Sequence, residues 1–315
     1  MYEVHLTGNF PRPEQLIDVS RQSDRGRATE HELQENLTSS TRAVIGLQIS
    51  NGLDVLVDGQ LSWQDLFRPF SKLLNGIETG TLTRWFDNNT FYRVPIVKDK
   101  VWRSEAAVSE YYRHDLMPTS RPYKAIMPGP YTFAKLSENT AYASFADLVD
   151  DLAHSLCNIS RELIDNGCKF LQFNEPSLCT ATAGELEIAK RGFEVLAKNS
   201  TKIMLQTYFD SVSRIVDKLL DFPVDCIGVD LYANDISIIS KYSFSRELSC
   251  GCIDGRNSLI EPAEQLVELM TKVRETVDSR HLYVGPNCDL EFLPYPVAEK
   301  KVRLLGDLRR RLNDQ

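Results

Sequence analysis

Apolar residues follow two alternating patterns along most of the chain, one of helix type and one of strand type. Residues 143–166 show the helix type, because their leucines and isoleucines recur every three or four positions and Gly167 follows the last of them. Short apolar runs bounded by polar turns indicate strands. We expect eight strands, at residues 3–8, 54–59, 125–130, 169–176, 202–209, 226–232, 248–255 and 282–290.

The strands are separated by helices, which favours parallel pairing through crossover connections. Eight such units predict an α/β fold, specifically a (β/α)8 TIM barrel, and no linker divides residues 1–315 into more than one domain. Residues 60–123 do not fit the repeat, and we expect them to form a helical, aromatic insertion over the barrel mouth, where the carboxyl ends of the strands meet. Residues 301–312 predict a terminal amphipathic helix.

Acidic side chains stand at the ends of two predicted strands. Glu175 ends the run FLQFNEPSL and is followed by Pro176, which restricts the backbone of both residues, and Asp230 ends the run CIGVD. Side chains at the carboxyl ends of barrel strands are the usual catalytic groups of this fold. Glu175 and Asp230 are therefore a candidate general acid and base pair, with loop anchoring as the alternative.

Composition narrows the class of partner. The net charge is −8 and the pI is near 5.3, which argues against nucleic acid or an anionic membrane surface as the general partner. No apolar run is long enough to span a bilayer, and the amino terminus lacks the pattern of a signal peptide. The seven cysteines suit reduced thiols. These features together predict a soluble, cytoplasmic protein.

Three of the cysteines raise the question of a metal. Cys250 and Cys252 share one face of a predicted strand and Cys288 lies near the end of the next, so a three-thiolate site is conceivable. This spacing differs from established zinc motifs, and small buried thiols are common in barrel interiors. Packing is the favoured interpretation.

Several motifs, in one order along nearly the whole chain, resemble cobalamin-independent methionine synthase. They are GNFPRP (8–13), DGQLSWQDLF (58–67), RWFDNNTFYRVP (84–95), PGPYTFAKLS (128–137), FLQFNEPSL (170–178), LQTYFDSV (205–212), IDGRN (253–257) and LYVGPNCDLEFLP (282–294). The resemblance is greater to the amino-terminal barrel of that two-barrel enzyme than to its catalytic carboxy-terminal barrel. It implies the barrel fold and a role in methyl transfer from a methyl-folate type donor to homocysteine.

The resemblance also implies where the catalytic barrel of the family would hold zinc. Its His-x-Cys pair falls near Thr207 and Phe209, its Glu at Asp230 and its last Cys at Cys288, so only Cys288 keeps a family ligand type. Phenylalanine cannot bind zinc. No cofactor is therefore firmly implied, and independent catalysis is in doubt. The carboxylate that would bind the homocysteine amino group is matched by Asn174, whose amide carries no charge.

Other residues are candidates for binding a substrate. By the resemblance, the segment around Trp85 and Asn89 contacts substrate or the second barrel, and aromatic rings with arginine charge suit a pterin or a polyglutamate tail. A purely structural role is the alternative for these side chains. The substrate-binding candidates are Arg12, Trp85, Asn89, Asn174, Tyr208 and Arg256.

Three functions remain open at this stage. The leading hypothesis is a donor-binding or accessory barrel that works with a separate zinc-bearing catalytic barrel. The second is a self-sufficient homocysteine or thiol methyltransferase, or another barrel enzyme, with a rebuilt site. The third is a non-catalytic binding module.

Overall fold

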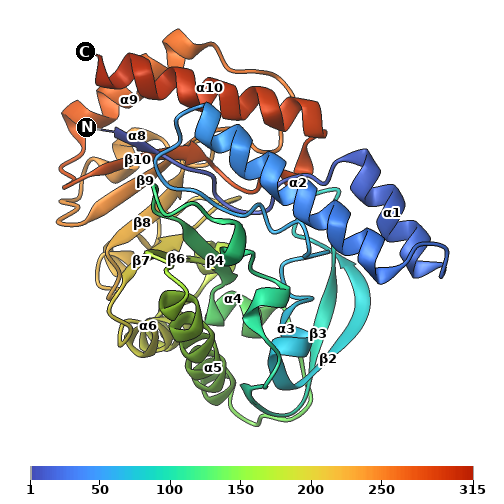
Figure 1. The fold of residues 1–315 in the computed structure, drawn as a ribbon. Coiled ribbons are helices and arrows are strands. Elements are labelled where there is room, and N and C mark those ends of the chain that lie inside the picture. The colour runs from blue at the N-terminus through green and yellow to red at the C-terminus, as the bar shows by residue number, and fades with distance from the viewer. Residues whose placement is uncertain (1, 315) are drawn as a thin grey trace.

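A curled sheet of seven parallel strands forms the centre of the computed structural model, which describes residues 2–314 (Figure 1). Along the sheet the strand order is β1-β10-β9-β8-β7-β6-β4. The strands are β1 (Tyr2–Val4), β4 (Lys124–Pro128), β6 (Phe170–Asn174), β7 (Lys202–Gln206), β8 (Cys226–Asp230), β9 (Glu247–Ile253) and β10 (Leu282–Pro286). Each lies within or close to a predicted strand, and the observed strands stop earlier because the chain turns into a rim loop.

The predicted strand at residues 54–59 closes the ring, although it forms isolated bridges rather than a full ladder. Val55 bridges His5 after β1, and Leu56 bridges Tyr123 before β4, both in parallel. The Asp54 N–H donates to the Val4 carbonyl at 3.0 Å. The two edges of the seven-stranded sheet therefore meet through this segment, which confirms the predicted barrel-type α/β fold.

Helices cover the outside of the sheet. The helices of two turns or more are α1 (Glu14–Asp24), α2 (Glu30–Ser50), α5 (Phe145–Asp165), α6 (Ala183–Leu196), α9 (Ala263–Thr276) and α10 (Tyr295–Asn313), and the shorter ones are α3 (Phe70–Leu73), α4 (Pro130–Lys135), α7 (Val216–Leu219) and α8 (Ile236–Ile239). Capping boxes begin α2 at Thr29 and α6 at Thr182. Helix α5 matches the prediction within two residues, and α10 buries the leucine stripe predicted near the carboxyl terminus.

The insertion at residues 60–123 is present and aromatic, but its predicted helical character is wrong. Its main elements are the antiparallel strands β2 (Leu74–Arg84) and β3 (Phe91–Arg103), and the short strand β5 (Glu138–Asn139) pairs with β3. Its helices are only the short α3 and the 3-10 turns Val108–Glu110 and His114–Leu116. Threonine, valine, isoleucine and aromatic residues favour strands, and the turn at Asp87, Asn88 and Asn89 favours a hairpin.

Buried hydrophobic side chains from Tyr2 to Leu312 form one main core cluster. This continuity supports the predicted single domain, which stays a prediction. The two ends of the described chain also meet, because the Tyr2 N–H donates to Asn313 Oδ1 at 2.9 Å (Figure 1). Within residues 2–314, no helix combines the length and the apolar character required to cross a bilayer.

Candidate functional site

The barrel mouth contains buried polar atoms that lack a hydrogen-bond partner among residues 2–314. They are Asn9 Oδ1, Gln60 Oε1, Asn174 Nδ2, Gln206 Oε1 and Tyr208 OH. All five residues follow, or end, a strand at its carboxyl side. Buried polar atoms are nearly always paired in folded proteins, because an unpaired one costs about 1–3 kcal/mol. The mouth therefore has the chemistry of a site that binds a polar ligand or ordered water.

Neighbouring groups determine which atoms of these amides face the mouth. Gln172 Nε2 donates to the Thr7 carbonyl, which can only accept, and also donates to Asn174 Oδ1 at 2.7 Å. Asn174 consequently presents its N–H groups. In the adjacent strand, Gln206 Nε2 donates to the Thr207 carbonyl at 3.1 Å, so Gln206 presents its oxygen. Asn174 and Gln206 are register partners, so neighbouring strands offer one donor and one acceptor.

Backbone strain is concentrated at the same end of the barrel. Among residues 2–314, the non-glycine residues with positive φ are Gln60, Phe86 and Phe209, at 54°, 48° and 76°. Gln60 follows the closing segment, Phe86 lies at the turn of the β2–β3 hairpin, and Phe209 follows β7. Such conformations cost about 1–3 kcal/mol each and are concentrated at functional sites. Their common location supports the mouth as the functional region.

Phe209 joins the hairpin to the barrel. Its ring lies 5.4 Å from that of Phe86, 6.0 Å from that of Phe292 and 4.6 Å from that of Tyr208, measured between centroids. The Arg256 guanidinium lies over the same ring at 5.2 Å. The predicted residues Tyr208 and Arg256 therefore both contact one aromatic side chain, Phe209.

Two carboxyl groups after β10, the buried Asp289 and the half-buried Glu291, add charge to this region. The Asn9 N–H donates to Asp289 Oδ1 at 2.9 Å, and Asn9 Nδ2 donates to Glu291 Oε2 at 3.2 Å. Burial raises the pKa of both carboxyl groups, and the charge of Asp289 raises the pKa of Glu291 further. Burial also raises the pKa of the Tyr208 hydroxyl well above its ordinary value, with Asp289 as the second cause.

A cavity of about 450 Å³ opens beside these carboxyl groups and contains the predicted residue Arg12. Its lining includes Phe10, Trp63 and Tyr295 together with Glu291. Burial lowers the pKa of Arg12, and the charge of Glu291 opposes this effect. Aromatic walls with one arginine and a few polar groups are typical of a small-molecule pocket, and the volume is within the usual range.

The predicted acid and base, Glu175 and Asp230, do not contact each other. Glu175 accepts hydrogen bonds from the backbone N–H groups of Tyr131 and Thr132, at 3.0 and 2.7 Å, at the start of α4. Burial raises its pKa to about 7. Asp230 accepts from the N–H groups of Phe209 and Tyr232, at 3.3 and 2.8 Å. Both carboxyl groups hold loops in place, while their catalytic role stays a prediction.

The hairpin candidates differ in exposure. Trp85 is buried, and its ring packs 5.8 Å from that of Phe67 and 5.5 Å from that of Tyr92. Asn89 is exposed at the hairpin turn, and its neighbour Thr90 lines the cavity that contains Arg12. Trp85 therefore packs in the core under the hairpin, and Asn89 lies at the edge of the mouth.

The positions that the resemblance assigns to zinc do not offer a donor set. Thr207 Oγ1 donates to the Gly228 carbonyl at 2.8 Å, Phe209 has no donor atom, and the Asp230 oxygens accept from backbone N–H groups. Burial, together with Asp289 and Asp230, raises the pKa of the Cys288 thiol well above its ordinary value. These residues do not fit a zinc ion. Across residues 2–314, no group of three or more His, Cys, Asp or Glu side chains is arranged to hold a metal.

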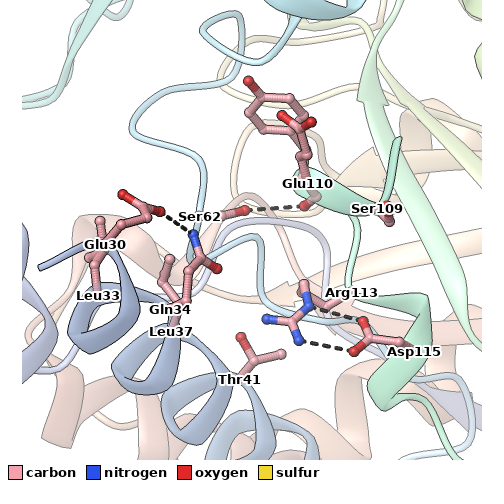
Figure 2. A pocket seen from close by; sticks show the side chains of 11 residues that line it. Glu30, Leu33, Gln34, Leu37, Thr41, Ser62, Ser109, Glu110, Arg113 and Asp115 are labelled. Carbon is pink, nitrogen blue, oxygen red and sulfur yellow. Dashed lines mark hydrogen bonds and ion pairs between the residues drawn. The ribbon is translucent and has the colours of Figure 1, made fainter. Parts of the chain in front are cut away.

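Another cavity, of about 640 Å³, lies away from the predicted residues, between α2 and the insertion (Figure 2). Its polar side chains largely satisfy one another. Arg113 forms a two-pronged ion pair with Asp115 at 2.9 Å, and Gln34 Nε2 donates to Glu30 Oε1 at 2.8 Å. We interpret this cavity as a seam between two packed elements.

Sequence reasoning missed several mouth residues, among them Asn9, Gln60, Gln206, Asp289 and Glu291. All five lie inside the quoted motifs, immediately at or after a predicted strand. Position relative to the strand end was the available signal. What it could not reveal is which of these polar side chains are buried and unpaired.

Comparison with known proteins gives the family of the chain. The sequence model described as "Cobalamin-independent synthase, N-terminal domain" matches residues 75–278. "Methionine synthase" of Saccharolobus solfataricus is 26% identical over 302 residues, which cover 94% of this chain and 90% of that protein. The 5-methyltetrahydropteroyltriglutamate–homocysteine methyltransferase of Bacillus thuringiensis is 30% identical over 248 residues. That match covers 76% of this chain and 32% of the methyltransferase, so the chain spans about a third of its length.

Solved structures confirm the fold. A B12-independent methionine synthase from Shewanella sp. W3-18-1, in complex with selenomethionine, superposes with a TM-score of 0.82 at 20% identity, covering 99% of both chains. The putative vitamin-B12-independent methionine synthase of Listeria monocytogenes gives 0.78 at 16% identity, covering 98% of this chain and 96% of that one. At these identities the likeness concerns architecture alone.

Proposed function

Because the chain belongs to the family of the N-terminal domain of cobalamin-independent methionine synthase, we propose that it binds a methyl-folate type donor at the barrel mouth. We further propose that it acts beside a zinc-bearing barrel that lies outside this sequence. The observation that carries the proposal is the 450 Å³ cavity around Arg12, whose lining includes Gln60, a residue with an unpaired oxygen.

The chemistry of the cavity and of the mouth suits such a donor. A pterin is a flat ring with donors and acceptors along its edge, and aromatic walls with amide groups recognise that combination. Gln60, Glu291 and Thr90 supply polar groups beside the rings of Phe10 and Trp63. The Arg12 guanidinium is suited to the carboxylates of a glutamate tail.

Exposed apolar side chains around the mouth support the proposal that a second barrel binds there. Exposed large hydrophobic residues are concentrated on the hairpin and on the loops after β8 and β9: Leu82, Phe86, Phe91, Tyr232, Leu259 and Ile260. Such side chains near a polar site favour a protein interface. The Bacillus relative extends far beyond the matched region, which leaves room there for a further barrel. A partner that supplies zinc would also complement the poor donor set of this chain.

Calorimetric titration with 5-methyltetrahydropteroyltriglutamate tests donor binding. We expect saturable binding that weakens about tenfold in Arg12→Gln, because a charge-assisted hydrogen bond contributes about 1.5–3 kcal/mol. Arg27→Gln is the matched control, since Arg27 is exposed and lies outside the cavity. Equal affinities of the two variants, or no binding to the unmodified protein, would contradict the proposal.

A methyl-transfer assay tests the accessory role. We expect the chain to be inactive alone with homocysteine and the methyl donor, and to bind a zinc-bearing barrel recovered from native extract. Leu259→Asp and Leu82→Asp should weaken that capture while leaving donor affinity unchanged, because both side chains are exposed. Turnover by the isolated chain would instead support a self-sufficient enzyme.

A further inference from the structure

A third cavity, of about 510 Å³, lies at the opposite end of the barrel from the mouth. It is lined by His114 and residues 117–123, which lead into β4, and by residues 166, 167 and 169, which connect α5 to β6. Because β4 and β6 begin there, the cavity is on the amino-terminal face. The proposed donor site is therefore separate from it, and neither depends on the other.

The charge of this cavity is opposite in sign to that of the protein. Its lining includes Arg121, Lys169 and His114 but no Asp or Glu, although the chain carries a net charge of −8. Within residues 2–314, neither Arg121 nor Lys169 takes part in an ion pair. Two uncompensated cations that face one concave surface create a local attraction for anions.

Unpaired hydrogen-bonding groups accompany these cations. His114 Nδ1 is buried without a hydrogen-bond partner. In the turn before β4, no hydrogen bond among the described residues uses the backbone N–H groups of Thr119, Ser120 or Arg121. Successive free N–H groups in a turn are a recurrent feature of anion-binding loops. The Arg121 guanidinium donates to the Leu53 carbonyl, which anchors it while leaving further N–H groups available.

The walls between the charged groups are apolar. Met117, Pro118, Pro122 and the ring of Tyr123 line the cavity, and the Tyr123 hydroxyl is held by the Asn166 carbonyl at 2.9 Å. A bare ion would leave these walls uncovered. The shape and the charge together suit a small organic molecule that carries a multiply charged oxyanion.

We propose that the cavity around Arg121 and Lys169 binds a small, multiply charged oxyanion, carried by a phosphate or by clustered carboxylates. Arg121 would hold two of its oxygens through the planar guanidinium, and Lys169 would supply the second charge. The Thr119 and Ser120 hydroxyls would contribute neutral hydrogen bonds. The two ligand types share this chemistry and differ in shape.

Equilibrium titration with pyrophosphate and with tri-γ-glutamate, at constant ionic strength, distinguishes the two sources. We expect saturable binding of at least one probe to the full chain. Arg121→Gln and Lys169→Gln should each weaken that binding about tenfold, since each removes one charge-assisted interaction. Lys198→Gln, at an exposed position outside the cavity, should leave it unchanged.

A second measurement separates this site from the mouth and from misfolding. Arg12→Gln should not alter binding of the anion that occupies this cavity, and the Arg121→Gln and Lys169→Gln variants should keep the unfolding midpoint of the unmodified protein in the absence of the probe. The proposal would be overturned if neither probe bound saturably, or if a variant carrying both Arg121→Gln and Lys169→Gln bound each probe as tightly as Lys198→Gln does.

Discussion

Carboxylates at the two ends of the barrel have different kinds of partner. At the amino-terminal end they pair with cations: Lys202 Nζ lies 2.7 Å from Glu247 Oε1, and Arg309 Nη2 lies 2.6 Å from Asp54 Oδ1. At the mouth the carboxylates of Glu175 and Asp230 are held by backbone N–H groups. The unpaired amides and all the strained non-glycine residues of the described chain are also at the mouth.

This difference indicates a division of duties. Charges that are already paired contribute to stability and have little left to offer a ligand. Buried groups without partners cost stability and are retained where a ligand or water completes them. The paired carboxylates at the amino-terminal end of the barrel interior therefore support the fold, whereas the unpaired amides of the mouth are available to a ligand.

The largest effect on stability is expected at a glycine whose missing side chain leaves space for a carboxyl group of the mouth. A Cβ at Gly129 would lie 2.1 Å from Glu175 Cδ, so Gly129→Ala must displace Glu175 from the N–H groups of α4. We expect a loss of about 3 kcal/mol in the free energy of unfolding, measured with urea. Gly184→Ala has nothing within 4 Å and is the control. Equal stability of the two variants would show that Glu175 is free to move.

Glu175 should also give the mouth a pH dependence. Burial raises its pKa from 4.5 to about 7 in the folded state, so the folded protein binds this proton more tightly than the unfolded chain does. The free energy of unfolding should therefore decline as pH rises from about 4.5 to 7, by on the order of 3 kcal/mol from this group.

Glu175→Gln should remove that slope, because glutamine does not titrate. The measurement is urea unfolding across this pH range for the variant and for the exposed control Glu187→Gln. Parallel curves for the two variants would mean that Glu175 titrates near its ordinary value.

Breaking a pair at the amino-terminal end should cost stability without altering function. Lys202→Met leaves Glu247 and the Tyr283 hydroxyl without their cation, and we expect a loss of about 2 kcal/mol because the pair is partly exposed. Donor affinity in the titration should stay unchanged. If Lys202→Met bound the donor more weakly under conditions in which the variant is fully folded, the division of duties between the two ends would be wrong.

The smallest expected change in the free energy of unfolding has opposite signs at the two ends of the barrel. The Tyr208 hydroxyl at the mouth is buried and unpaired, whereas the Tyr123 hydroxyl donates to the Asn166 carbonyl. Tyr208→Phe should raise the free energy of unfolding by about 1 kcal/mol and weaken donor binding, and Tyr123→Phe should lower it by about 1 kcal/mol. The same sign for both variants would show that a water already satisfies Tyr208.

Much of the architecture was accessible from local pattern. The strand at residues 170–174 and the helix at 145–165 appear within a few residues of the expected bounds, because burial of one face imposes a period that the sequence displays. The hairpin was not accessible from local pattern, because β2 and β3 pair with each other and lack a regular alternation of buried and exposed residues. The burial of Tyr92 in β3 depends on Phe67, which itself packs against Phe133 of α4.

The candidate site divides in the same way. Its location at the strand ends, and the candidates Arg12, Asn174 and Tyr208, followed from where polar residues succeed apolar runs. The hydrogen-bond partners of Glu175 could not be predicted in this way, because the two N–H groups lie 44 and 43 residues away, in α4. Likewise, the cavity beside Arg12 is built from loops after three different strands and from the hairpin.

The sequence by itself determined the alternation of helices and strands, the rim on which polar groups gather, and the family. Only the tertiary structure decided which of those polar groups are paired. Periodicity is a property of neighbouring residues in the chain, whereas hydrogen-bond partners and desolvation depend on segments that meet only when the barrel closes.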